Sequence, residues 1–326
     1  MRFQSTKKKN LPLIIFIIFS LLISCYLLTQ IDLWEISKYL LIIPTMLMGS
    51  LVAGSSPLGG GIVAFPVMSY LLTELAELAS IYSLAIQSFG MTSASIFLYI
   101  HFKDKIKFDV LKFTIPIALL TCLLSPFLKE YMALSNLKLI FASFWFGNGI
   151  ILFYIKERIT TTEEKRVLSK NFTEILIISA VSISGALISS IIGSGADFLL
   201  FIYLATRLGK DMKSATATSV IQMAFVSTFL TIMNFTYVAS SQSILKVSHY
   251  LAYSIPVVVI FAPLGSYILT RVSKKILKNW IYFIIIAQYM TALVILELGY
   301  FDYIKSILIV TSTLLIYYIV RKVQFK

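Results

Sequence analysis

The stretch GSLVAGSSPLGGGIVAFPV at residues 49–67 decides the fold, because the run Pro57-Leu58-Gly59-Gly60-Gly61 interrupts an apolar segment with residues that disfavour a continuous helix. A second apolar segment, GALISSIIGSGADFLLF at residues 185–201, is interrupted at 193–197. A shift of 136 residues superimposes the pairs Gly49 and Gly185, Leu51 and Leu187, Gly59 and Gly195, Gly61 and Asp197, and Phe65 and Phe201.

The match continues beyond these two breaks. With one residue of gap, residues 83–87 fall on 218–222, so that Gln87 meets Gln222. Farther along, Pro116 and Pro126 fall on Pro256 and Pro263. Each half therefore has a glycine-broken segment, a span with a glutamine, a span with two prolines and a closing span. A duplication explains this order.

The composition indicates an integral membrane protein. Of the 326 residues, 58% are hydrophobic and 13% are charged, too much apolar surface for one soluble core. Crossing a bilayer takes about 20 apolar residues. Uncharged apolar segments of about this length predict eight crossings, at residues 11–29, 82–100, 113–128, 139–155, 214–237, 247–270, 280–296 and 306–320.

The charges between the spans predict how the broken segments lie. If both were ordinary crossings, two outward loops would carry nine basic residues, which opposes the positive-inside rule. If each segment instead enters and returns on one side, these loops become cytoplasmic, as do both termini. The sequence thus predicts an all-α inverted repeat of about eight transmembrane helices and two re-entrant hairpins.

The repeat divides the chain into five parts. We expect a cytoplasmic N-terminus and first span at 1–38, repeat 1 at 39–156, a basic cytoplasmic linker at 157–171, repeat 2 at 172–298, and a last span with a basic cytoplasmic C-terminus at 299–326. The ascending arm of each hairpin has about 17 to 20 residues, although half a bilayer needs only about 10. We expect the long arms to be tilted or partly interfacial.

The net charge of +13 is spread over short loops, so it does not indicate binding to nucleic acid. Cys25 and Cys122 both lie in apolar segments and predict neither a disulfide nor a metal site. We expect no cofactor. The partners that we expect are the lipid bilayer and a small anionic substrate.

The two breaks are the predicted binding site, because irregular backbone is tolerated at membrane depth only inside protein or beside a polar cavity. We expect them to meet near the midplane, where the half-helix after each break offers its positive end to a small anion. The alternative is that the glycines only permit close helix packing. The candidate substrate-binding residues are Gly59, Gly60, Gly61, Gly193, Gly195, Gln87, Gln222 and Ser219.

Asp197 is the one formally charged side chain expected far from a span end, and Pro57 stiffens the other break. A carboxylate at this depth is costly, so we assign Asp197 and Pro57 to coupling or gating. Asp197 fits a proton carrier, a cation ligand or a gate. It fits equally well the N-cap of a half-helix that begins near Phe198.

Residues 49–67, their echo at 185–201 and the run ATATS at 215–219 resemble the glycine-rich motifs of the sulfite exporter TauE/SafE family. The resemblance covers roughly residues 39–298. It implies a multi-pass permease of the cell inner membrane for small sulfur-containing anions such as sulfite, thiosulfate or organosulfonates. The family's usual three-glycine run is Gly195-Ala196-Asp197 in the second half here, and this departure is compatible with a different anion or coupling ion.

The sequence therefore predicts a transporter that uses proton- or ion-coupled alternating access. An anion channel is the nearest alternative, because the same hairpins would suit a pore. A membrane-embedded enzyme is a weaker alternative, since the spans contain no paired acids, histidine cluster or activated nucleophile, and we expect no enzymatic activity.

Overall fold

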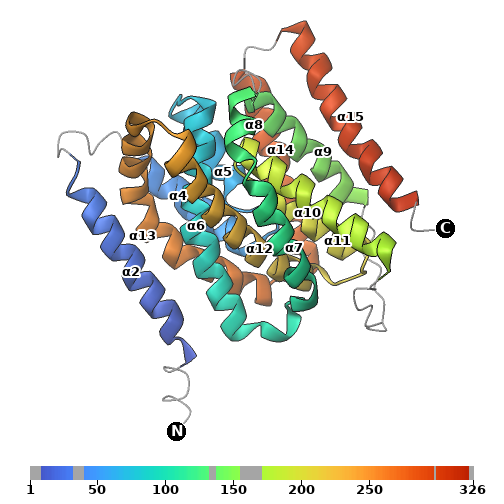
Figure 1. Cartoon of the computed structure of the whole chain (residues 1–326), viewed down its shortest axis with the longest axis horizontal. Coiled ribbons are helices and arrows are strands. Elements are labelled where there is room, and N and C mark those ends of the chain that lie inside the picture. The colour runs from blue at the N-terminus through green and yellow to red at the C-terminus, as the bar shows by residue number, and fades with distance from the viewer. Residues whose placement is uncertain (1–8, 32–39, 132–136, 155–170, 297–298, 323–326) are drawn as a thin grey trace.

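The computed structural model describes residues 9–31, 40–131, 137–154, 171–296 and 299–322. In this part of the chain the secondary structure is helical and includes no β-strand (Figure 1). The expected basic linker at 157–171 lies, apart from Asn171, outside the described residues, as do residues 1–8 and 323–326 of the two termini.

The first half follows the expected order of elements. It comprises α2 (Leu11–Leu28), α4 (Ile42–Ser55), α5 (Gly61–Pro66) with a π-helical continuation η2 (Val67–Leu71), α6 (Ala76–His101), a short 3-10 turn η3 (Lys103–Lys105), α7 (Phe108–Cys122), α8 (Ser125–Tyr131) and α9 (Leu137–Tyr154). The first predicted break is therefore the interval between α4 and α5.

The second half repeats this order. It comprises α10 (Phe172–Ile192), α11 (Ala196–Thr206), α12 (Met212–Met233) with a π-helical continuation η5 (Asn234–Val238), α13 (Ser241–Arg271), α14 (Lys274–Ile295) and α15 (Tyr300–Lys322). The second predicted break lies between α10 and α11. Helices α2 and α15 lie at opposite edges of the molecule in Figure 1, where α2 packs on α13 and α15 packs on α9.

Among the described residues, five helices are long and apolar enough to cross a membrane: Leu11–Leu28, Ala76–His101, Phe172–Ile192, Met212–Val238 and Ser241–Arg271. Four of them coincide with expected crossings. The fifth is α10, which the sequence analysis treats as one arm of a hairpin. Its 21 residues extend to roughly 30 Å, about the full thickness of the hydrocarbon layer.

The expected single crossing at 113–128 is wrong in detail. The structure ends α7 at Cys122 and starts α8 at Ser125, with a turn between them. Pro126 stands at the second residue of α8, where its missing N–H costs nothing, whereas in the middle of a helix it would remove a hydrogen bond. The matching helix α13 accommodates both Pro256 and Pro263 without a break.

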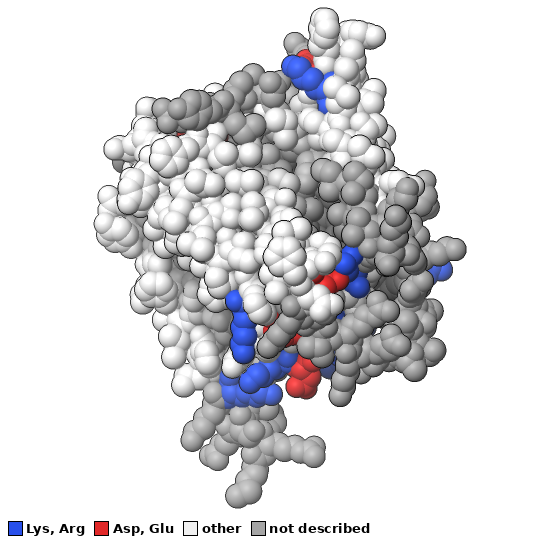
Figure 2. Space-filling view, turned by 45° about the vertical axis from the view of Figure 1, so that its right-hand side comes forward, with Lys and Arg blue, Asp and Glu red and all other residues white. Residues whose placement is uncertain are grey.

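Three loops meet at one end of the molecule, which we call the basic end. The α6–α7 loop contacts the start of α12, since Lys105 Nζ lies 3.9 Å from Asp211 Oδ2 and the Lys107 N–H donates to Thr218 Oγ1. Lys213 Nζ also donates to the Thr270 carbonyl near the end of α13. The Lys and Arg residues in or next to these loops are Lys103, Lys105, Lys107, Arg207, Lys210, Lys213, Arg271, Lys274 and Lys275. The visible charged side chains in Figure 2 lie mostly in the lower half of that view and at its upper tip.

The broken segment α10–α11 begins and ends at the basic end. Glu174, in the first turn of α10, accepts hydrogen bonds from Arg207 Nε at 2.8 Å and from the Tyr203 hydroxyl at 3.1 Å. Arg207 directly follows α11. The two arms therefore run in opposite directions and are joined at their outer ends by an ion pair.

The other broken segment, α4–η2, is flanked by residues at the opposite end. Helix α2 runs there from the basic end, where Asn10 hydrogen-bonds His101, and Ser24 donates to the Ala252 carbonyl in the first half of α13. After η2, Glu74 binds Lys246 Nζ at 2.7 Å and the Tyr250 hydroxyl at 2.8 Å, also near the start of α13.

The two halves exchange their packing partners. The first arm α4 packs mainly on α13, the proline-containing helix of the second half, and the first arm α10 packs mainly on α7, the proline-containing helix of the first half. The glutamine-bearing helices α6 and α12 lie against each other between these pairs. This exchange puts the two breaks in the interior.

Glycine allows the closest of these contacts. A Cβ added to Gly54 would collide with the Ala262 carbonyl oxygen, and one added to Gly265 would collide with the Leu51 carbonyl oxygen. Ser266 donates to the Gly54 carbonyl at 3.1 Å across the same contact. The backbones of α4 and α13 are therefore nearly in contact, as small residues permit in membrane bundles.

We predict that Gly54→Ala lowers the free energy of unfolding by about 1–3 kcal/mol, because the new methyl group must push α4 away from α13. Gly90→Ala is the matched control, since its Cβ would lie 3.5 Å from Val258 Cβ at an ordinary contact distance. Thermal unfolding in detergent measures both variants. Equal stability of Gly54→Ala and the parent would contradict the close contact.

Candidate functional site

The two breaks contact each other in the middle of the bundle. A Cβ built on Gly61 would lie 2.5 Å from Ser194 Cβ, and a Cβ built on Gly59 would lie 2.5 Å from Asp197 Oδ2. The prediction that the two breaks contact each other is therefore confirmed. Because α5 begins at Gly61 and α11 begins at Ala196, the starts of two half-helices converge at this contact.

Three side-chain oxygens converge on Gly59. Measured from the ideal Cβ position of this glycine, Asp197 Oδ2 is at 2.5 Å, Gln87 Oε1 at 2.8 Å and Ser194 Oγ at 3.4 Å. Gly59 has φ +67°, a left-handed conformation that glycine adopts without strain. A larger residue at position 59 would collide with these oxygens and would strain the left-handed backbone, so the position requires glycine.

Gln87 holds the second break in place. Its Nε2 donates to the Gly193 carbonyl at 2.7 Å and to the Ser83 carbonyl at 2.9 Å, and the Ser83 hydroxyl donates to Gly193 as well. Two carbonyl acceptors on one side of the amide fix its orientation. Oε1 must then face Gly59, and it has no hydrogen-bond partner among the described residues.

The expectation that Asp197 is an N-cap is wrong, because Gly195 is the N-cap of α11 and Asp197 is the second residue of that helix. Helix α11 begins at Ala196, two residues before the expected start, and Asp197 Oδ1 accepts from the Phe198 N–H at 3.0 Å in its first turn. The other oxygen, Oδ2, faces Gly59 and has no hydrogen-bond partner in the described chain. The carboxylate is fully buried. One oxygen thus stabilises the helix start while the other remains available.

The glycines of the second break are constrained by close contacts. Gly193 has φ +80°, and its Cβ would lie 2.8 Å from the Ser80 carbonyl oxygen on α6. Gly195 has φ +132° and is the N-cap of α11. The Ala196 N–H then donates to Ser189 Oγ of α10. This break is therefore held between α6 and its own first arm.

The structure adds one residue that sequence reasoning missed and separates others that it grouped. Ser194 is fully buried between the breaks, and its only sequence signal is its place inside the second interruption. Ser219 donates to the Thr216 carbonyl of its own helix. Gln222 is buried but makes no hydrogen bond in the described chain, so it does not mirror Gln87. Pro57 lies in the turn between α4 and α5.

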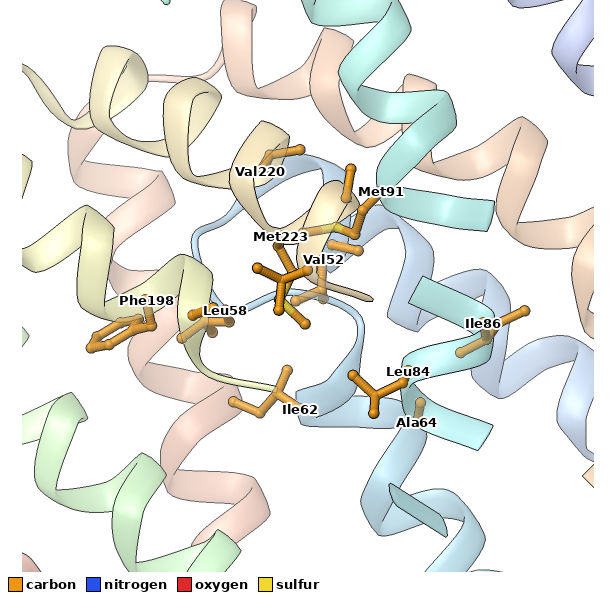
Figure 3. Close-up of a cluster of buried hydrophobic side chains, with 14 of the residues drawn as sticks. Val52, Leu58, Ile62, Ala64, Leu84, Ile86, Met91, Phe198, Val220 and Met223 are labelled. Atoms are coloured by element: carbon orange, nitrogen blue, oxygen red, sulfur yellow. The ribbon is translucent and has the colours of Figure 1, made fainter. Parts of the chain in front are cut away.

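An apolar cluster surrounds the first break. Figure 3 shows Leu58, which is fully buried, grouped with side chains of α6, α11 and α12 that include Leu84, Phe198 and Met223. Leu58 occupies the position that matches Ser194 in the repeat. The first break is therefore anchored by an apolar side chain, and the second presents a hydroxyl at the equivalent place.

A small cavity adjoins the cluster between α4, α6 and α13. Its volume is about 10 Å³, room for about one water molecule. Its lining consists of Met46, Gly49, Ser50, Ala53, Gly60, Ile86, Gln87, Gly90, Met91 and Val258. A sulfur oxyanion has at least four heavy atoms, so the helices must separate before one could enter here.

We predict that the three adjacent glycines differ sharply in tolerance to alanine. Gly59→Ala and Gly61→Ala should each cost about 1–3 kcal/mol of stability, through a left-handed backbone in one case and a collision with Ser194 in the other. Gly60→Ala is the control, because its Cβ would lie 3.4 Å from Gln87 Cγ and its φ is −74°. Thermal unfolding of the three purified variants measures this order, and equal effects would refute the described contact.

A protein-family profile matches most of the chain. The profile described as "Sulfite exporter TauE/SafE" matches residues 41–292, a range that contains both breaks and both glutamine-bearing helices. Neither a curated protein nor a solved structure is similar enough to the chain to match it. A family match over most of the chain, together with helices of membrane-spanning length, identifies its class. The chain belongs to the sulfite exporter TauE/SafE family of membrane transport proteins.

Proposed function

We propose that the chain is a cell-membrane permease for a small sulfur-containing anion, with sulfite as the first candidate and thiosulfate or an organosulfonate as others. The single observation that carries this proposal is the contact between the two breaks, where the starts of α5 and α11 converge among buried polar side chains. The family match supports the transport function and the class of substrate.

The proposed architecture is an inverted repeat with two re-entrant hairpins and eight crossings. The Glu174–Arg207 pair supports it, because it joins the outer ends of α10 and α11 at one end of the molecule. The exchanged packing of α4 on α13 and α10 on α7 also supports it. The length of α10 indicates that its hairpin reaches deep into the bilayer, and we therefore place the two breaks off the exact midplane.

The proposed orientation puts the basic end in the cytoplasm, together with the N- and C-termini. The positive-inside rule supports this, since the basic residues of three connecting loops gather there. On this orientation the α4–η2 hairpin enters from outside and the α10–α11 hairpin enters from inside. Separation of α4 from its neighbours would open the site to one side, and separation of α10 would open it to the other.

The anion would bind at the half-helix starts. The N-terminal turn of a helix carries partial positive charge and free N–H groups, and it binds oxyanions even without a basic side chain. Asp197 lies at the same place and would repel the anion if its charge were uncompensated. Transport therefore requires a cation or a proton that neutralises Asp197, which makes coupled transport more consistent with the site than a simple pore.

We predict saturable sulfite flux in proteoliposomes that contain the purified chain, and its stimulation by an imposed ion gradient. Thiosulfate, sulfoacetate and chloride form the comparison panel, and liposomes without protein give the background. Linear flux that does not saturate and does not respond to any gradient would favour the channel alternative. Absence of flux for every sulfur anion would contradict the proposed function.

A further inference from the structure

We propose that the point where the two breaks meet is a binding site for one sodium ion, formed by Asp197 Oδ2, Gln87 Oε1 and Ser194 Oγ. The site itself follows from geometry, whereas its role in coupling rests on the proposed transport function. The three oxygens lie 2.5, 2.8 and 3.4 Å from a single point, the ideal Cβ position of Gly59. They come from two different helices and from the second break.

The three oxygens share an unusual property for a protein interior. Each belongs to a side chain at most 2% exposed, and none has a hydrogen-bond partner among the described residues. Buried polar atoms are nearly always paired, because an unpaired one costs free energy. Three unpaired oxygens grouped beside Gly59 therefore indicate a ligand that accepts several lone pairs.

With Asp197 ionised, the three groups cannot all satisfy one another. The Gln87 amide donates its N–H groups to Gly193 and Ser83, so Oε1 can only accept. An ionised Asp197 also only accepts, and the Ser194 hydroxyl has one proton to give. In the described chain no Lys or Arg forms an ion pair with Asp197. Two acceptors and a negative charge thus remain for a cation.

The chemistry of the three ligands favours sodium. Hard cations prefer oxygen, and a single carboxylate with two neutral oxygens suits a single positive charge. The described residues contain no group of three His, Cys, Asp or Glu side chains, as a transition metal would need. Unwound backbone next to half-helices is also where transporters bind Na⁺. Because Gly59 has no side chain, no Cβ covers the three oxygens on the side that faces this residue.

Sodium at this point would explain the coupling. Neutralising Asp197 removes the repulsion between its carboxylate and an anion at the start of α11, so each ligand strengthens binding of the other. Thermodynamic linkage requires the two effects to be equal in size. Sodium and the sulfur anion would then move together.

The test is binding of radioactive sodium to the full-length purified chain in detergent, with choline replacing sodium at constant ionic strength. We expect saturable binding, a rise in Tm with sodium, and much weaker effects of potassium. Asp197→Asn, which keeps the shape of the side chain, should weaken sodium binding at least about tenfold, because the site loses its charge. Asp302→Asn is the control, since Asp302 lies on α15 and pairs with Lys305.

Ser194→Ala gives a second measurement if Asp197→Asn fails to fold. It should also weaken sodium binding, whereas the control keeps the parent affinity. No saturable sodium binding to the folded parent, or unchanged binding in Asp197→Asn, would overturn the site. Sulfite flux driven by a proton gradient alone would overturn sodium coupling and leave the proposed permease intact. Sodium binding without flux of any sulfur anion would support the sodium site but contradict the proposed permease function.

Discussion

Two helical segments in this molecule stop and restart in its interior, and the backbone groups freed at each stop must find hydrogen bonds inside the protein. Helix α6 satisfies the end of α10, since Ser80 donates to the Ile191 carbonyl while Ser83 and Gln87 both donate to Gly193. Helix α13 satisfies the end of α4 through Ser266 and the Gly54 carbonyl. Lipid cannot supply such bonds, so α6 and α13 must lie directly against the two breaks.

The same requirement explains the glycines and the exchanged packing. A donor on a neighbouring helix reaches a backbone carbonyl only when the two helices nearly touch, and Gly54, Gly193 and Gly265 permit that approach. The breaks in turn concentrate polar atoms where the chain is otherwise apolar. Gln87 does two things there: its nitrogen fixes the second break and its oxygen faces the first. One side chain thus supports the second break and also places an unpaired oxygen where the two breaks meet.

The sequence predicted the larger features because they depend on composition and on repeated glycine, glutamine and proline. Among the described residues, helices long and apolar enough to span a membrane occur at four of the expected crossings, and both breaks and the contact between them are present. The interruption between α7 and α8 was missed, because a proline predicts a kink or a break equally well and α13 contains two prolines without a break.

The finer features of the site depend on which side chain faces which, and a single sequence does not contain that information. The repeat places Gln87 and Gln222 in equivalent positions, yet only Gln87 hydrogen-bonds to a break. In the sequence, Ser194 resembles many other serines of the chain. Only the structure shows that its side chain lies against both Gly59 and Gly61. The sequence alone did not show that α11 begins at Ala196, which places Asp197 inside the helix, nor that its two carboxylate oxygens face different groups.

The central claim is that two broken helices enter the membrane from opposite sides and meet at their breaks. Labelling of single cysteines with a membrane-impermeant maleimide, in a cysteine-free background in intact and opened cells, tests it most directly. Cysteines at Leu40 and Leu75, which flank the first broken segment, should both react from outside, and cysteines at Phe172 and Lys210, which flank the second, should both react only from inside. Labelling of the two members of either pair from opposite sides would contradict the account.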